Sequence, residues 1–171
     1  MKNTEYLNNE DGLHLMRQLV NTPKTVVMAT QLNKIPFSSY PVTLQAMDEQ
    51  GALWFIIERQ SDHFKDIDKD NRVVVLYFDK LGKKYISIYG NITRVRDERM
   101  VDEFWNTKLS HSFKGKEDAN LILLNMNIEN AEYWNLENAI TTAGLFKEED
   151  SIPPKKDLAL EGKVYINMQN H

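Results

Sequence analysis

Apolar residues along this chain of 171 residues gather in short segments, most of which have the length of a β-strand. Residues 25–30 are β-branched and apolar, and the polar stretch after them has the length of a hairpin connection to residues 36–46, so these two segments are expected to pair. Residues 52–58 form an apolar run that is typical of a strand buried on both faces. The same reasoning predicts strands at 73–78, 85–96 and 121–128.

Helical spacing appears between these strands. Apolar residues from Leu13 to Val20 recur at helical intervals, which predicts a first helix over about 10–21. Ser61 is placed to cap a short helix before the strand at 73–78, and Asp97 is placed to cap another. The helix after Asp97 carries an apolar stripe formed by Met100, Val101, Phe104 and Trp105. Residues 110–120 are expected to form a loop.

Six strands linked mostly by short turns and interrupted by helices favour one α+β domain, built on a closed or partly closed antiparallel barrel. Gly90 lies inside the strand expected at 85–96, where a glycine often marks a bulge or a barrel corner. A turn is expected at 79–83. The charged segment beyond the last strand contains Pro153 and Pro154, which predicts weak order until residues 163–168.

Charge and composition narrow the classes of function. The 21 lysines and arginines against 25 acidic residues give a net charge of -4, which offers no electrostatic reason to expect nucleic acid as a partner. The chain has no cysteine, so disulfides, thiolate metal sites and cysteine nucleophiles are excluded, and redox chemistry requires a bound cofactor. No apolar run has the length of a signal peptide or a membrane span, and a cytoplasmic protein without a membrane partner is expected.

Metal binding is not predicted. Asp66, Asp68 and Asp70 imitate the start of a calcium loop, but the sixth position is Asn71 and the twelfth is Tyr77, where the loop needs glycine and glutamate. The three aspartates are therefore expected on the solvated face and at the end of a short helix. The four histidines lack the spacing of a zinc site, and no glycine-rich phosphate loop is present.

An ordered series of short motifs runs from about Leu13 to Trp134. The motifs are Tyr40-Pro41-Val42, Leu53-Trp54-Phe55 followed by Ser61, Tyr85-Ile86-Ser87-Ile88-Tyr89-Gly90, Arg96-Asp97 with Trp105, and Ala131-Glu132-Tyr133-Trp134. The series resembles the general stress protein branch of the pyridoxamine 5'-phosphate oxidase-like flavoproteins, a family of FMN-binding split barrels. The resemblance implies a six-stranded antiparallel split β-barrel of Greek-key type with peripheral helices over residues 1–135. Residues 136–171 would then be a C-terminal tail that packs on the barrel or on a partner subunit.

The same resemblance implies a homodimer whose two FMN molecules lie in clefts between the subunits. In such clefts cationic and hydroxyl groups meet the phosphate, and strands lie against the ring. No catalytic residue is singled out, because the flavin carries the chemistry. The cofactor-binding residues implied in this chain are Ser39, Tyr40, Pro41, Phe55, Ile56, Ile57, Ser61, His63, Ser87 and Trp134.

The sequence departs from the family pattern where the phosphate would bind. Tyr40 stands for an arginine, His63 for a lysine and Ile57 for a hydroxyl residue. The groups that are available to compensate are Lys34, Arg59, Lys65 and His63 itself. The hypothesis is an FMN-dependent oxidoreductase that acts on an unidentified small substrate. The alternative is a non-enzymatic split-barrel dimer that has lost tight FMN binding and serves as a ligand-binding or stress-associated protein.

Overall fold

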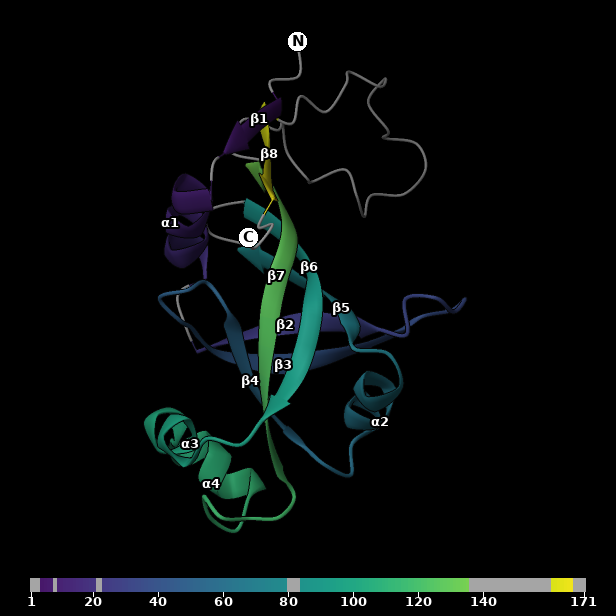
Figure 1. Cartoon of the computed structure of the whole chain (residues 1–171), viewed down its shortest axis with the longest axis vertical. Coiled ribbons are helices and arrows are strands. Elements are labelled where there is room, and N and C mark those ends of the chain that lie inside the picture. Colours follow the sequence, from purple (N-terminus) through teal and green to yellow (C-terminus); the bar gives the residue numbers. More distant parts are fainter. Residues whose placement is uncertain (1–3, 8, 21–22, 80–83, 136–160, 168–171) are drawn as a thin grey trace, which may run out of the picture.

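The computed structural model describes residues 4–7, 9–20, 23–79, 84–135 and 161–167, which form eight strands and four helices (Figure 1). In chain order the elements are β1 (Thr4–Leu7), α1 (Asn9–Leu19), β2 (Lys24–Thr30), β3 (Ser38–Met47), β4 (Leu53–Glu58), α2 (Asp62–Lys69), β5 (Arg72–Asp79), β6 (Lys84–Val95), α3 (Glu98–Phe104), α4 (Thr107–Ser112), β7 (Leu121–Asn135) and β8 (Glu161–Asn167).

The central feature is a closed barrel of six antiparallel strands. The strands follow the order β7-β4-β3-β2-β5-β6, and β6 pairs again with β7 to close the ring. Beyond β7 the sheet continues through β8, which is antiparallel to β7, to β1, which is parallel to β8. The expected six-stranded antiparallel barrel is confirmed, and β1 and β8 are an extension that the hydrophobic pattern did not predict.

Strand β7 is long enough both to close the barrel and to pair with the extension. Its first residues, from Leu121 to Met126, pair with β4, whereas Leu123 to Asn135 pair with β6. A register shift follows Tyr89, at Gly90, where a Cβ atom would lie only 2.0 Å from the carbonyl oxygen of Asn127. Only glycine allows the two backbones to approach this closely. The bulge that the sequence predicts at Gly90 is therefore confirmed.

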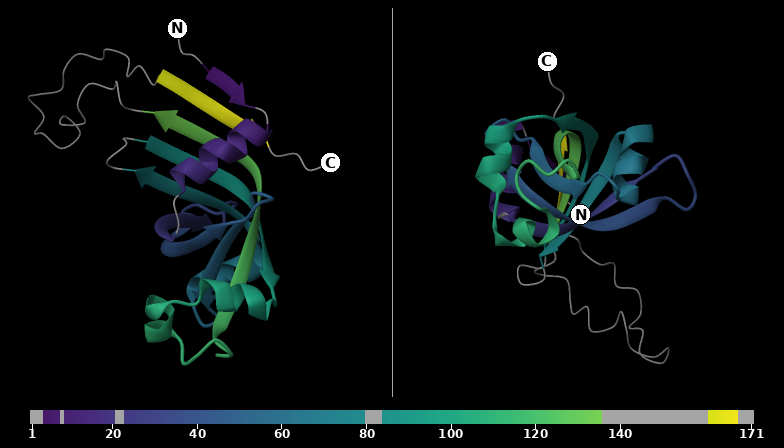
Figure 2. Two further views of the ribbon diagram at one scale, coloured as in Figure 1. Left: turned by 90° about the vertical axis from the view of Figure 1, so that its left-hand side faces the viewer. Right: turned by 90° about the horizontal axis from the view of Figure 1, so that it is seen from below.

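Two hydrophobic clusters lie on the two faces of β4. Leu53, Phe55 and Ile57 face the barrel interior, and Ile56 packs in a second cluster with Leu109 and the other buried residues of α3 and α4. This confirms the expectation of a strand buried on both faces. Met16 and Val20 join the barrel cluster, so the segment of α1 covers one end of the barrel while α3 and α4 lie at the other (Figures 1 and 2).

Most predicted elements are present within a few residues of their expected bounds, and the differences have physical causes. The strand expected at 121–128 continues to Asn135, because β6 and β8 provide backbone partners on both sides. The loop expected at 110–120 is wrong in its first residues, which complete α4. The turn at 80–83 and the tail at 136–160 lie outside the described residues. Among the helices that the structure describes, none is long and apolar enough to cross a membrane.

Candidate functional site

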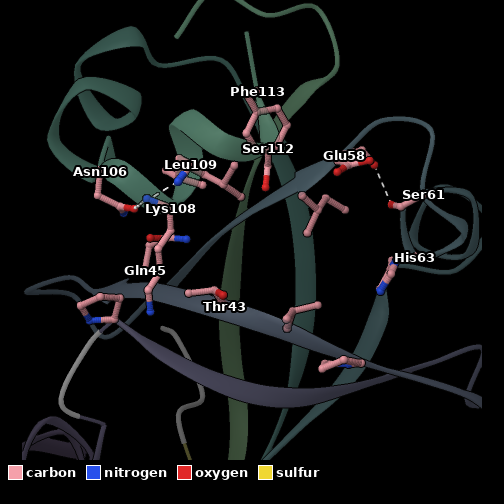
Figure 3. A pocket seen from close by; sticks show the side chains of 15 residues that line it. Thr43, Gln45, Glu58, Ser61, His63, Asn106, Lys108, Leu109, Ser112 and Phe113 are labelled. Carbon is pink, nitrogen blue, oxygen red and sulfur yellow. Dashed lines mark hydrogen bonds between the residues drawn. The ribbon is translucent and has the colours of Figure 1, made fainter. Parts of the chain in front are cut away.

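A cavity of about 370 Å³ opens at one side of the barrel, which is within the size range of small-molecule sites (Figure 3). Its floor comes from β3 and β4, one wall from the start of α2 and the opposite wall from α4. The lining residues are Pro23, Pro41, Val42, Thr43, Gln45, Ile56, Ile57, Glu58, Ser61, His63, Asn106, Lys108, Leu109, Ser112 and Phe113.

The floor is mainly apolar. Val42, Ile56 and Ile57 are buried strand residues, and Leu109 and Phe113 come from the second hydrophobic cluster. Thr43 and Gln45 on β3 add a hydroxyl and an amide group to this surface. Apolar walls with a few polar groups suit a flat heteroaromatic ligand, which hides its faces from water and forms hydrogen bonds at its edge.

The α2 wall begins at Ser61, which caps this helix as the sequence predicts. Its Oγ accepts a hydrogen bond from the Phe64 backbone N–H at 3.3 Å and donates one to the Glu58 carbonyl oxygen at 2.6 Å. The single hydroxyl proton of Ser61 is thereby already in use. Ser61 can still accept a hydrogen bond, but donating one to a ligand would break its bond to Glu58.

His63 lies in the first turn of α2 with its ring against that of Tyr40, the two centroids being 3.8 Å apart. Its Nδ1 is buried and has no hydrogen-bond partner among the residues that the structure describes. Burial lowers the pKa of the imidazole, and the negative charges of Asp62, Asp66 and Glu58 only partly oppose this effect. His63 is therefore neutral at pH 7 and can donate only one N–H.

Tyr40 is held in place by the buried carboxylate of Asp66. The Tyr40 hydroxyl donates to Asp66 Oδ2 at 2.8 Å, the Thr30 hydroxyl donates to the same oxygen at 3.2 Å, and the Gln31 amide donates to Oδ1. Burial alone would raise the pKa of Asp66, but the hydrogen bonds from Tyr40, Gln31 and Thr30 outweigh it, so the pKa is lowered. The Asp66 carboxylate is therefore ionised at neutral pH.

The expectation that Asp66 is solvated is wrong. Asp66 is only 6% exposed, whereas Asp68 is exposed and Asp70 forms an ion pair with Arg72 at 2.7 Å. Asp66 lies beside Ile67 on the buried side of α2, where three hydroxyl and amide donors replace water. In the sequence, the signal for this burial was the place of Asp66 next to the apolar Ile67, on the buried side of a short amphipathic helix.

The α4 wall was missed by the sequence analysis because its six residues carry one buried apolar side chain, Leu109. Asn106 caps this helix through Oδ1, which accepts from the backbone N–H groups of Lys108 at 3.0 Å and Leu109 at 3.2 Å. An asparagine before a short polar segment was the signal that could have found α4. Lys108 is the single lysine or arginine among the described residues that line the pocket.

The structure brings together five of the ten residues expected to bind a cofactor. Pro41, Ile56, Ile57, Ser61 and His63 line the pocket.

The other five expected residues do not line the pocket. Tyr40 lies behind His63, and Ser39 is exposed beside it on β3. Phe55 is fully buried in the barrel, and Ser87 and Trp134 lie on β6 and β7. Sequence reasoning assigned no cofactor-binding role to the residues of the α4 wall, nor to Pro23, Val42, Thr43, Gln45 and Glu58.

Of the four groups expected to compensate, His63 lines the pocket, whereas Lys34, Arg59 and Lys65 do not. Lys65 forms an ion pair with Asp62 at 2.8 Å, and the Arg59 Nε–H donates to the Ala119 carbonyl oxygen at 2.8 Å. Lys34 is exposed in the connection between β2 and β3.

The pocket fits the FMN that the sequence resemblance implies, although unevenly. The apolar floor and the Gln45 amide suit an isoalloxazine ring, and the partnerless Nδ1 of His63 is a polar atom that a ligand could satisfy. The phosphate is less well provided for, because a neutral imidazole stands where a cation is expected and the nearby Ser61 hydroxyl is already in use. Lys108 supplies the positive charge on the other wall.

Comparison with known proteins places this geometry in a family. The sequence model of the family described as "Pyridoxamine 5'-phosphate oxidase like" matches residues 11–150. No curated protein is significantly similar to the chain.

Solved structures with the same fold include three from bacteria. General Stress Protein 26 from Bacillus anthracis str. Sterne is 25% identical over 71% of this chain and 92% of its own, with a TM-score of 0.62. A putative general stress protein 26 from Jannaschia sp. CCS1 is 20% identical over 92% of this chain and 99% of its own, with a TM-score of 0.68. The general stress FMN/FAD binding protein from Xanthomonas citri is 21% identical over 85% and 97%, with a TM-score of 0.60.

Proposed function

Because this chain belongs to the pyridoxamine 5'-phosphate oxidase-like family, we propose that it binds FMN in the pocket between β3, β4, α2 and α4 and acts as a flavin-dependent oxidoreductase on a small substrate. The observation that carries the proposal is the pocket itself, with an apolar floor and polar groups at both walls. The Xanthomonas citri protein, described as FMN/FAD binding, supports the same assignment.

The chain's own residues bind and shield the cofactor in this proposal. Bound FMN supplies the reducible ring that accepts and returns electrons. Ile56, Ile57 and Phe113 exclude water from the ring, and Thr43 and Gln45 offer hydrogen bonds to its polar edge. Because the cofactor carries the redox chemistry, neither of the titratable groups Glu58 and His63 is assigned a role as general base.

We also propose that two copies of the chain form a homodimer through the face of β2, β5 and β6. Val27 and Leu76 are register partners on this face, as are Phe78 and Tyr85, and all four side chains are between 37% and 43% exposed. The Phe78 and Tyr85 rings lie 4.8 Å apart, centroid to centroid. Such a contiguous apolar surface favours association, and a second copy is the partner that the resemblance to dimeric flavoproteins implies.

The first experiment is a visible absorption spectrum of the purified protein after incubation with FMN and removal of the excess by gel filtration. We expect a retained flavin band near one equivalent per chain. Anaerobic bleaching of this band by NADH or NADPH, faster than that of free FMN, is the expected sign of oxidoreductase activity. A folded protein that stays colourless after reconstitution would contradict flavin binding and return the question to the non-enzymatic alternative.

A matched pair of substitutions locates the bound flavin. Ser112 and Ser110 are both exposed on α4, but only Ser112 lines the pocket. Ser112→Trp fills the cavity and is expected to abolish flavin retention, whereas Ser110→Trp is expected to retain the wild-type amount. Equal retention by both variants would place the flavin elsewhere.

A further inference from the structure

The two walls of the pocket differ in charge. On the α2 wall the neutral ring of His63 is surrounded by the carboxylates of Glu58, Asp62 and Asp66, all three of which act on it electrostatically. On the α4 wall Lys108 is the charged lining residue, and its backbone N–H donates to Oδ1 of the uncharged Asn106 side chain at 3.0 Å. Figure 3 shows Lys108 and Asn106 across the opening from Ser61 and His63.

The α2 wall is poorly suited to a phosphate in three respects. The Ser61 hydroxyl proton is used by the Glu58 carbonyl oxygen, and the Lys65 ammonium is used by Asp62. The positive end of the α2 dipole is already opposed by Asp62 in the first turn. A dianion placed beside His63 would therefore meet the negative charges of Glu58 and Asp66, while Lys65 is already paired with Asp62.

We propose that Lys108 on α4, instead of the start of α2, receives the anionic end of the ligand, so that the pocket selects phosphorylated over unphosphorylated flavin through this lysine. The inference rests on the proposed flavin binding and adds the residue that determines the specificity. In this orientation the uncharged floor holds the ring, and the neutral His63 faces an uncharged part of the ligand. Asn106 and Ser112 stand beside Lys108 as uncharged hydrogen-bonding groups.

The test compares the dissociation constants of FMN and riboflavin, which differ only in the phosphate. Flavin fluorescence quenching is measured at pH 7.5 for the wild type, Lys108→Gln, Lys114→Gln and His63→Gln. Lys114 is the matched control, because it is exposed in the same region but does not line the pocket. Thermal melts and near-ultraviolet circular dichroism establish that each variant is folded.

We expect the wild type to bind FMN more tightly than riboflavin. Lys108→Gln is expected to weaken FMN binding by about tenfold while leaving riboflavin binding within about twofold, since a charge-assisted contact is lost. Lys114→Gln is expected to match the wild type. His63→Gln is expected to change both dissociation constants in parallel, because it alters a wall that both ligands share.

Three results would overturn the inference. One is a preference for FMN that survives in Lys108→Gln. Another is a preference that disappears in His63→Gln alone, which would place the phosphate on the α2 wall. The third is a wild type that binds neither flavin, which would remove the proposed function together with the inference, whereas the first two outcomes leave flavin binding intact.

Discussion

At the scale of single residues, Asp66 holds the α2 side of the pocket together. Its carboxylate accepts hydrogen bonds from the side chains of Thr30, Gln31 and Tyr40, and Tyr40 in turn supports the ring of His63. Gln31 has a φ of 52°, in the left-handed region that costs a non-glycine residue about 1 kcal/mol or more. The hydrogen bond to Asp66 offsets this cost and fixes the end of β2 against α2.

Asp66→Asn is therefore expected to lower the free energy of unfolding by about 2 kcal/mol, because the amide cannot accept from three donors and places N–H groups among them. Chemical denaturation measures the loss. Asp68→Asn, on the exposed side of the same helix, is the matched control and should change stability by less than about 0.5 kcal/mol. Equal stability of the two variants would contradict the role given to Asp66.

The lowered pKa of Asp66 also predicts a pH dependence. Because the folded pKa lies below the ordinary value of about 4, the folded state gains stability from this group above that value. The gain is lost as the pH falls through the lower folded pKa, where Asp66 becomes protonated. Denaturation midpoints measured from pH 6 to pH 2 should fall more steeply for the wild type than for Asp66→Asn, and parallel curves would refute the assignment.

Gly90→Ala places a Cβ atom 2.0 Å from the Asn127 carbonyl oxygen, a backbone atom that cannot move without disturbing the pairing of β6 with β7. We expect a loss of about 3 kcal/mol, at the upper end of overpacking effects, or failure to fold. Gly115→Ala is the control, since no atom lies within 4 Å of its added Cβ. Thermal melts of the two purified variants make the comparison.

At the scale of elements, the sequence predicted those whose signals are local. The cap at Asp97 and the apolar stripe that follows it specify α3, and the apolar run of 52–58 specifies a strand buried on both faces. The helix α4 was missed because one buried leucine in six residues carries no periodicity. The pairing of β1 with β8 joins segments more than 150 residues apart, and no local pattern encodes such a contact.

The same distinction between local signals and contacts made only in the tertiary fold applies to the candidate site. Ser61 and His63 were expected because the family resemblance aligns them with phosphate-binding positions, whereas Lys108 and Gln45 reach the pocket only through the tertiary fold. The place of Asp66 beside Ile67 on α2 was a signal for its burial, but the donors that surround its carboxylate could not be predicted, because they come from β2, β3 and the residue after β2.

The cap of α4 links this short element to the pocket. Asn106→Ala removes the acceptor for two backbone N–H groups and is expected to destabilise the helix by about 1 kcal/mol. Flavin binding should weaken because Lys108 and Leu109 lose their fixed positions. Asn106→Ser keeps a capping oxygen and should retain most of the affinity. Fluorescence titration with FMN separates the two, and equal weakening would assign Asn106 a direct contact with the ligand in place of a capping role.

At the scale of the whole molecule, the barrel has two distinct outer surfaces. The helices α3 and α4 cover the outside of β4 with the second hydrophobic cluster, while Val27, Leu76, Phe78 and Tyr85 leave an apolar face on β2, β5 and β6. Closure of the barrel pairs the backbone of most strand edges. The surface that a partner would cover is therefore formed by the apolar side chains of this face. The proposed dimer covers this face.

Leu76→Glu tests this arrangement without disturbing the barrel interior, because Leu76 is 37% exposed and its side chain lies on the outer face. The substitution places a carboxylate at the centre of an apolar interface, where the charge loses its water and finds no partner. We therefore expect the mass measured by light scattering to fall from that of a dimer to that of a single chain. Ile35→Glu is the control, since Ile35 is a fully exposed apolar residue outside this face and its charge should leave the mass unchanged. Two outcomes would show that the apolar face is not where two copies meet. One is a wild type that is already monomeric, and the other is a dimer that survives Leu76→Glu but dissociates with Ile35→Glu.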